Sequence, residues 1–413
     1  MTNLQHNDCT KPKNQAVYIN LLACLFLYAY LAVSSLSYIS WVPAILNTLT
    51  LYGFIGVGII ATLITKRYLT FRIHTIWYFA FCVVCLISCL YARNTNISFS
   101  TTMDMIKILI FTFVVSNVLD SHEKIKTSMG VYSTATIGLF IYLAATDQLV
   151  MEDGERLGES LTGNANAFAG VFMVAAMFSV YFMFFSKRRI TKIAFFVMLC
   201  LQLYSLALSG GRKSFIIPIL LLCAMKLIST DKKGRKHLIR NALIVAVVLY
   251  AVFSAIFYIE DLYNSIGYRM EGMMSVVTGE GKIDASSNIR GNMIKDALEL
   301  WKEKPLFGYG VTNFQKLSGY GTYSHNNYAE LLCGLGLFGL AFYYCFYLIC
   351  FYKLLSNKHQ GKYRWYWIFT LICLLVFDFG AISYNMFMVQ FLLLISLMDI
   401  PDITKTKEDG KAI

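Results

Sequence analysis

The sequence predicts an all-α membrane protein in which about 12 helices cross the bilayer. Composition gives the first indication: the chain of 413 residues is 57% hydrophobic and only 15% charged, with a mean hydropathy of +0.57. A soluble domain typically carries about 25% charged residues. The second indication is that long apolar runs recur from one end of the chain to the other. Runs of about 18 residues or more are long enough to cross a bilayer as helices.

Hydropathy distributes the expected spans along the whole chain, which we treat as one membrane domain, 1–413. The expected spans are residues 17–38, 42–64, 73–92, 102–119, 128–146, 165–185, 191–208, 214–229, 241–259, 327–352, 365–382 and 384–400. No cleavable signal peptide is expected, because the first apolar run is too long for one and no small-residue cleavage site clearly follows it.

The positive charge of the chain predicts its orientation in the membrane. The net charge is +12, which in a soluble protein would favour a nucleic-acid partner. Here Lys and Arg gather in every second loop, the pattern of the cytoplasmic side, so no nucleic-acid partner is expected. Because the number of spans is even, both termini are expected in the cytoplasm. The 11 cysteines lie almost wholly in apolar runs, which predicts packing and not disulfides or a metal site.

Residues 260–324 form a long polar segment on the predicted outer side, between the ninth and tenth spans. Loops between bundle helices usually have about 2–8 residues, so a segment of this length is expected to have a function. Its pattern predicts a helix over 288–303, capped by Ser287 and ended by Pro305, with a turn at 308–310. Such a helix either lies on the membrane or packs over the mouth of the bundle. Its apolar face consists of Ile289, Met293, Ala297 and Trp301.

Four arginines on the predicted outer side are candidates for binding an anion. Arg212 follows two glycines and opens a span, where backbone amides and the helix dipole favour phosphate. The alternative is an arginine that extends to the membrane interface. Arg290 lies in the first turn of the predicted loop helix, where a cation is unfavourable because it opposes the helix dipole. A bound anion would remove this conflict; the alternative is that Arg290 is a solvated surface residue. Arg269 and Arg156 are weaker candidates, and Arg156 has acidic neighbours with which it could pair.

A polar cluster, Tyr-Ser-His-Asn-Asn-Tyr-Ala-Glu at 323–330, opens the tenth span. His325 is either a general base near neutral pH or part of a polar cap in which Ser324 is the N-cap. Glu330 lies about one turn deeper, where a carboxylate is costly without a partner, and could orient His325 or bind a sugar hydroxyl. Asn326 is a further candidate for binding the substrate.

Two other polar groups at span positions are candidates. Asn164 and Asn166 open the sixth span and could donate hydrogen bonds to sugar hydroxyls. Asp378 is an intramembrane carboxylate in the eleventh span, for which a structural and a functional role are both open.

Three segments in this order resemble the superfamily of O-antigen polymerases and O-antigen ligases, which are bacterial envelope glycosyltransferases. They are GGRKSF at 210–215, NIRGNMIKDALELWKEKPLFGYGVTNF at 288–314 and SHNNYAELLCGLGLFG at 324–339. The spacing from the His-Asn pair to Gly336 and Gly339 is similar to the His-Asn and paired-glycine pattern of the superfamily. Outside the region from Arg212 to Gly339, the resemblance extends only to a bundle of many spans.

The resemblance implies a GT-C-like helical fold and an enzyme that works on the outer face of the bacterial cytoplasmic (inner) membrane. It implies a donor glycan on undecaprenyl pyrophosphate, and neither a nucleotide sugar, a metal nor another cofactor. Arg212 and Arg290 would hold the pyrophosphate and stabilise its charge as it leaves, and His325 would take the proton from the acceptor hydroxyl. The lipid tail would lie between spans, and the long loop would cover the site. Secondary roles would fall to Arg156, Arg269 and Glu330.

We predict a polymerase that joins lipid-linked repeat units of O-antigen, capsule or exopolysaccharide by glycosyl transfer. The first alternative is an O-antigen ligase, which moves the finished glycan to lipid A–core. The ligase form of the glycine pattern often continues with Thr or Val, whereas Leu340 follows here. The second alternative is a flippase or other transporter of lipid-linked sugars, which would carry charges along a path through the bilayer. Expected partners are the lipid-linked donor, the acceptor glycan or lipid A–core, membrane lipid and a chain-length regulator.

Overall fold

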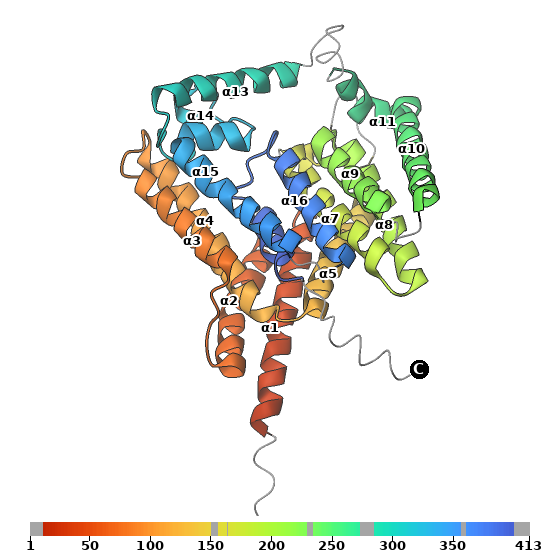
Figure 1. Cartoon of the computed structure of the whole chain (residues 1–413), viewed down its shortest axis with the longest axis horizontal. Helices are drawn as coiled ribbons and strands as arrows, with labels where there is room; N and C mark the ends of the chain where they lie inside the picture. Colours follow the sequence, from red (N-terminus) through yellow and green to blue (C-terminus); the bar gives the residue numbers. More distant parts are fainter. Residues whose placement is uncertain are drawn as a thin grey trace, which may run out of the picture.

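The structure is a computed structural model that describes residues 11–149, 156–162, 164–228, 234–272, 285–356 and 361–399. Helices are the only regular secondary structure in these ranges (Figure 1), so the predicted all-α class is confirmed. Every expected span overlaps a helix. These helices are α1 (Lys11–Leu36), α2 (Ala44–Lys66), α3 (Ile73–Ser88), α4 (Thr95–Val118), α5 (His122–Ala145), α7 (Ala165–Phe185), α8 (Arg189–Leu208), α9 (Arg212–Ile228), α10 (Gly234–Tyr258), α15 (Asn327–Ser356), α16 (Gly361–Phe377) and α17 (Phe387–Ser396).

Eight of the described helices are long and apolar enough to cross a membrane: α1, α2, α4, α5, α7, α8, α10 and α15. The others that overlap expected spans are shorter, and the number of about 12 crossings stays a prediction. α17 has 10 residues, which as an α-helix extend roughly 15 Å, half of the hydrocarbon core. It is shorter than the expected span 384–400 because the buried residues just before it, including Ser383 and Tyr384, are not helical.

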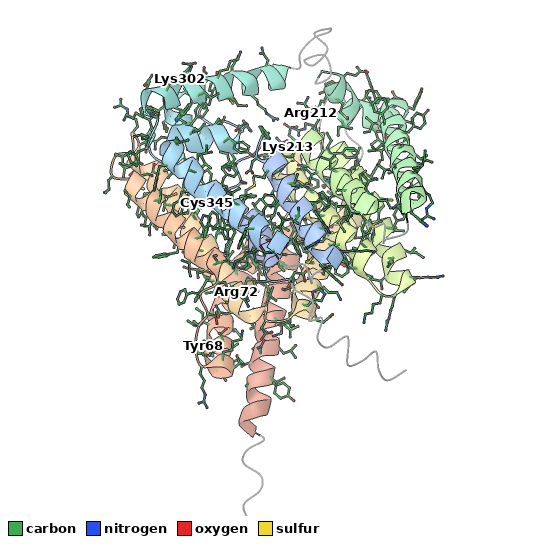
Figure 2. All side chains as sticks on the ribbon, in the orientation of Figure 1. Tyr68, Arg72, Arg212, Lys213, Lys302 and Cys345 are labelled. Carbon is green, nitrogen blue, oxygen red and sulfur yellow. The ribbon has the colours of Figure 1, made fainter. Side chains whose placement is uncertain are left out.

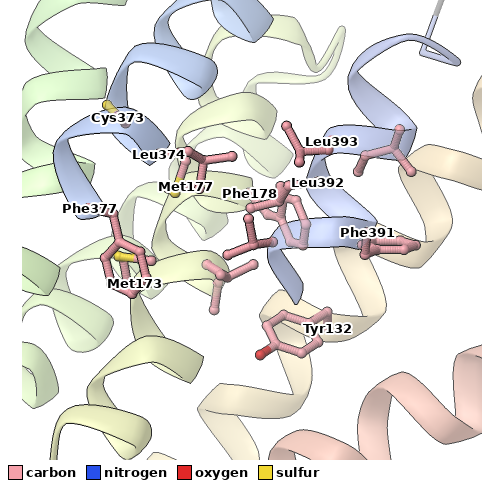
Figure 3. Close-up of a cluster of buried hydrophobic side chains, with 14 of the residues drawn as sticks. Tyr132, Met173, Met177, Phe178, Cys373, Leu374, Phe377, Phe391, Leu392 and Leu393 are labelled. Atoms are coloured by element: carbon pink, nitrogen blue, oxygen red, sulfur yellow. The ribbon is translucent and has the colours of Figure 1, made fainter. Parts of the chain in front are cut away.

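α7 lies in the interior of the bundle and is apolar on all faces, as expected for a helix surrounded by protein. It packs against α5, α8 and α9, and α16 and α17 contribute to the same core. α10 stands at the edge, where its apolar stretch is only 11% buried, so most of its side chains are available to lipid. Figure 3 shows part of the core, with Tyr132, Met173, Met177, Phe178, Cys373, Leu374, Phe377, Phe391, Leu392 and Leu393 labelled.

The long segment after α10 contains α11 (Glu260–Leu262), the π-helix η1 (Tyr263–Gly267), α13 (Ala285–Glu303) and α14 (Phe314–Leu317). α13 is the predicted loop helix and ends before Pro305, as expected. It begins at Ala285, so the prediction that Ser287 caps it is wrong: Ser287 lies inside its first turn. Figure 1 shows α13 crossing one end of the bundle, above α14 and the start of α15.

The apolar face of α13 packs on the bundle. Met293 and Ala297 are buried and form a cluster with Phe314 of α14 and with Ala329 and Cys333 of α15. This contact favours the second of the two roles expected for the helix, packing over the mouth of the bundle, over lying on the membrane surface. Only the N-terminal member of the face, Ile289, is exposed.

α15 is broken at Gly336, whose backbone (φ 67°, ψ −167°) is not helical. The break separates the backbone groups at 333 and 334 from those at 337 and 338, which would be paired in a continuous helix. The loop after α13 forms hydrogen bonds with the backbone groups on both sides of the break. Tyr309 N–H donates to Cys333 O at 3.0 Å and Gly310 N–H to Gly334 O at 2.8 Å. Leu337 N–H donates to Pro305 O at 2.8 Å and Phe338 N–H to Leu306 O at 3.2 Å.

This exchange of hydrogen bonds explains two glycines of this region, Gly308 and Gly336. A Cβ on Gly336 would lie 2.3 Å from the carbonyl carbon and oxygen of Leu306, and one on Gly308 would lie 2.5 Å from Cys333 O. Both glycines also have a positive φ, which residues with a side chain rarely adopt. The close contact of two backbones is thus possible only without side chains at these positions.

Gly336→Ala should lower the stability of the protein by about 3 kcal/mol or more, because the methyl group both strains the backbone and separates the loop from α15. The measurement is thermal unfolding of the purified protein in detergent. The control is Gly56→Ala in α2, where no atom lies within 4 Å of the added Cβ and the backbone is helical. The control should melt at or slightly above the wild-type temperature. Equal melting temperatures for the two variants would contradict the role given to Gly336.

Candidate active site

The predicted functional residues lie mainly at the end of the bundle that α13 covers. The N-termini of α7, α9 and α15 meet there. Figure 2 shows Arg212 and Lys213 at the end of α9 that faces α13. Hydrogen bonds and electrostatic interactions connect most of the candidate side chains, as described below.

The turn before α9 brings Arg212 and Arg269 together. Gly210 has φ +61°, and a Cβ there would lie 2.8 Å from Ser265 O and 3.2 Å from Arg156 Nε. The predicted close approach of backbone at the Gly-Gly turn is therefore present. Arg212 Nη1 donates to Arg269 O at 2.7 Å, which joins α9 to the residues after η1.

Arg156 lies against the same turn. Its Nε donates to Ser209 O at 2.9 Å and its Nη2 donates to the Oδ1 of Asn166 at 3.2 Å. Of its acidic neighbours, Glu159 acts on it electrostatically, while residues 150–155 lie outside the described part of the chain.

The arginines are close enough to repel one another. Burial and then the charge of Arg269, with a weaker effect of Arg290, lower the pKa of Arg156 to about 10, while Glu159 acts in the opposite direction. Arg156 is still charged at neutral pH. Because like charges are held together in a partly buried place, an anion bound among them would be stabilised.

His325 occupies a strained position beside these cations. Its φ is +57°, and its ring lies 4.4 Å from the ring of Tyr323, centroid to centroid. Burial, followed by the charges of Arg290 and Lys213, lowers the pKa of His325 to about 4. The imidazole is therefore neutral at physiological pH and able to accept a proton, as a general base must.

The polar cluster around His325 is held by Asn326 and Glu330. Asn326 Oδ1 accepts from Ala329 N–H at 3.0 Å, so Asn326 is the N-cap of α15. The prediction that Ser324 is the cap is wrong: its hydroxyl donates to Asn326 O at 3.0 Å. Glu330 is buried, and its Oε2 accepts from Ser324 N–H at 2.9 Å. Glu330 thus holds the backbone next to His325.

The two predicted asparagine ligands are engaged with protein. Asn326 also donates weakly to Phe379 O, at 3.4 Å, through its Nδ2. Asn164 is exposed and caps α7, where its Oδ1 accepts from Asn166 N–H at 3.1 Å and from Ala167 N–H at 3.3 Å. Local capping explains both residues, and binding of sugar by them stays a prediction.

Two further groups lie in this region. Lys213 was not predicted as a site residue, and the role of Asp378 was left open. Lys213 Nζ lies over the ring of Phe377, 5.2 Å from its centroid, and near His325 and Arg290. Its signal in the sequence was a second cation next to Arg212 in a tight outer turn. Asp378 is buried, and its Oδ2 accepts from Tyr344 OH at 2.7 Å. Its carbonyl oxygen accepts from Asn327 N–H at 2.8 Å, so Asp378 has at least a structural role.

Residues 197–344 match a family model described as O-antigen ligase. The resemblance to the O-antigen polymerase and ligase superfamily is confirmed. The superfamily consists of glycosyltransferase-like membrane enzymes that act on lipid-linked glycans and acceptors. The matched region runs from α8 into α15 and includes Arg212, Arg269, Arg290 and His325, whereas Arg156 lies before it. A comparison with curated proteins found no match.

Arg290→Gln should raise the pKa of His325 from about 4 toward its ordinary value of about 6.5, because it removes the charge with the largest electrostatic effect on the imidazole. NMR titration of protein with labelled histidine in nanodiscs would measure this, with His325→Asn to assign the signal. Lys302→Gln is the matched control, since Lys302 lies on the same helix and pairs with Glu299. An unchanged pKa in Arg290→Gln would show that the two side chains do not interact.

Proposed function

We propose that this protein is a polymerase of lipid-linked polysaccharide repeat units on the outer face of the bacterial cytoplasmic membrane. The donor would be a glycan on undecaprenyl pyrophosphate, and the acceptor a sugar hydroxyl of a second lipid-linked glycan. The observation that carries the proposal is that Arg156, Arg212, Arg269 and Arg290 interact with one another at the covered end of the bundle, and that Arg290, on α13, also acts on the neutral His325. These are the groups that an anionic leaving group and a proton-releasing acceptor require.

The reaction is a substitution at the anomeric carbon of the donor sugar. His325 takes the proton of the acceptor hydroxyl as its oxygen forms a bond to that carbon. The bond between the carbon and the pyrophosphate oxygen breaks, and undecaprenyl pyrophosphate leaves with the bonding electrons. The guanidinium groups of Arg212 and Arg290 stabilise the negative charge that grows on the pyrophosphate. The donor already carries a good leaving group, so positioning, cations and a base suffice without a metal.

Donor binding would also activate the base. In the free protein the charges of Arg290 and Lys213 help to lower the pKa of His325. A bound pyrophosphate offsets those charges, so the pKa of the imidazole rises and it becomes a stronger proton acceptor. The histidine would thus gain basicity mainly when a donor is present.

The ligase remains a second candidate function because the matched family model is described as O-antigen ligase. Leu340, in place of the Thr or Val frequent in ligases, favours the polymerase. Both enzymes would use the same donor chemistry and differ in the acceptor. A transporter is the less favoured alternative, since the candidate cations gather at one end of the bundle and not along a path through it.

Deletion of the gene distinguishes the candidates by the surface polysaccharide seen on a gel. Loss of a polymerase should leave single repeat units attached to the cell surface, because transfer to the final acceptor continues. Loss of a ligase should leave no glycan on lipid A–core. A deletion strain that keeps a normal ladder contradicts both functions.

Arg212→Ala and Arg290→Ala should each reduce transfer by roughly 100-fold or more, because each removes a cation that stabilises the leaving group. Complementation of the deletion strain, with protein levels checked by immunoblot, measures this. Lys302→Ala, an exposed position on the same helix as Arg290, should complement fully. Full complementation by Arg212→Ala and Arg290→Ala would remove the arginines from the mechanism.

His325→Gly tests the base without straining the backbone, because glycine accepts the positive φ at this position. Transfer by the purified variant should fall by about 100-fold or more, and free imidazole in the buffer should restore part of it. His325→Asn also tolerates the backbone but occupies part of the space of the ring, so imidazole should rescue it less than His325→Gly. Full activity of His325→Gly without imidazole would exclude His325 as the base.

A further inference from the structure

Lys213 is a partly buried cation whose surroundings leave its ammonium group available. In the described part of the chain no acidic oxygen lies within 4.0 Å of Nζ. Its ammonium nitrogen lies over the face of the Phe377 ring, 5.2 Å from the centroid. An ammonium that is partly withdrawn from water and has no carboxylate partner is costly, so its position requires an explanation.

Among the described residues, Asp378 is the acidic group that acts on Lys213, and one of its two carboxylate oxygens is engaged elsewhere. Asp378 Oδ2 accepts from Tyr344 OH at 2.7 Å and from Asn327 Nδ2 at 3.4 Å. Its effect on Lys213 is electrostatic and at a distance. Asp378 therefore favours the charged ammonium without occupying its three N–H donors.

The ammonium faces the same region as the candidate base and the arginines. Lys213 and Arg290 repel each other electrostatically, and both act on His325. Gly380 lies close to the end of the Lys213 side chain: a Cβ added to this glycine would lie 2.8 Å from Nζ. Gly380 thus leaves the space in which the end of the Lys213 side chain lies.

We propose that Lys213 is a further catalytic residue, whose ammonium group donates hydrogen bonds to the pyrophosphate of the donor and of the released carrier. This inference rests on the proposed function, because it names a second type of cation for the same leaving group. Arg212 is tied to Arg269 O, whereas a lysine is a compact charge with three donors on a flexible stem. Lys213 can therefore follow the phosphate oxygens as their charge grows during bond breakage.

The test is binding of farnesyl pyrophosphate, which stands for the released carrier, to the full-length protein in nanodiscs. Lys213→Met keeps the length and apolar stem but removes the charge, and it should weaken binding by about 10–100-fold. Lys213→Arg should restore most of the affinity. Binding of farnesyl monophosphate, which has fewer negative oxygens, should change less than that of the pyrophosphate in Lys213→Met.

Gly380→Ala provides a variant in which the charge is retained but displaced. Its backbone has no positive φ, and the added methyl group meets only the flexible end of Lys213, so the variant should fold. It should weaken pyrophosphate binding by several-fold while the melting temperature stays within a few degrees of wild type. A large fall in melting temperature with unchanged affinity would overturn the proposal and assign Lys213 a structural role.

The outcomes separate this inference from the proposed function. If the wild type binds and Arg212→Ala weakens binding, while Lys213→Met binds like the wild type, the role of Lys213 is overturned and the proposed function stands. If the wild type does not bind farnesyl pyrophosphate, both proposals fail. If Lys213→Met loses affinity and Lys213→Arg regains it, the role of Lys213 is supported.

Discussion

The exchange of backbone hydrogen bonds at Gly336 is the constraint on which the rest of the site depends. Inside a membrane protein, a broken helix leaves polar backbone groups that must find partners within the protein. Here the loop after α13 supplies them, residue for residue, on both sides of the break. The same loop ends the helix that carries Arg290, and the first half of α15 follows directly on His325. One break in one helix therefore fixes a cation and a base in relation to each other.

The site also shows how a protein can hold charges that oppose folding. Several cations share a partly buried region, where burial, followed by the neighbouring positive charges, lowers the pKa of both Arg156 and His325. Hydrogen bonds to backbone carbonyls at Ser209 and Arg269 keep two of the guanidinium groups in place. Carbonyl oxygens orient an arginine without neutralising it, whereas a carboxylate would compete with an anionic ligand. The like charges lower the stability of this part of the fold but leave the site ready to bind an anion, a common feature of active sites.

Hydropathy predicted much of the fold. The candidate site residues were predicted from their side-chain chemistry and from the order of the motifs along the chain. Each expected span overlaps a helix because a long apolar run has few other structures open to it in lipid. Capping was predicted less well: Ser287 and Ser324 both have suitable side chains, but neither is the N-cap, since which residue starts a helix depends on tertiary contacts. The short α17 was not foreseen, because apolar composition does not distinguish a helix from a buried irregular segment. Lys213 was missed as a site residue because its proximity to Gly380 and His325 joins positions far apart in the sequence.

The left-handed backbone at His325 limits how this position can change by mutation. A single nucleotide change in a histidine codon gives Asn, Asp, Tyr, Leu, Pro, Arg or Gln. Of these, only Asn and Asp readily adopt a positive φ, and neither offers an imidazole. A small molecule that binds the His325 ring would thus meet a target with few routes to resistance at that residue, because most substitutions that disrupt the contact also strain the chain that holds it.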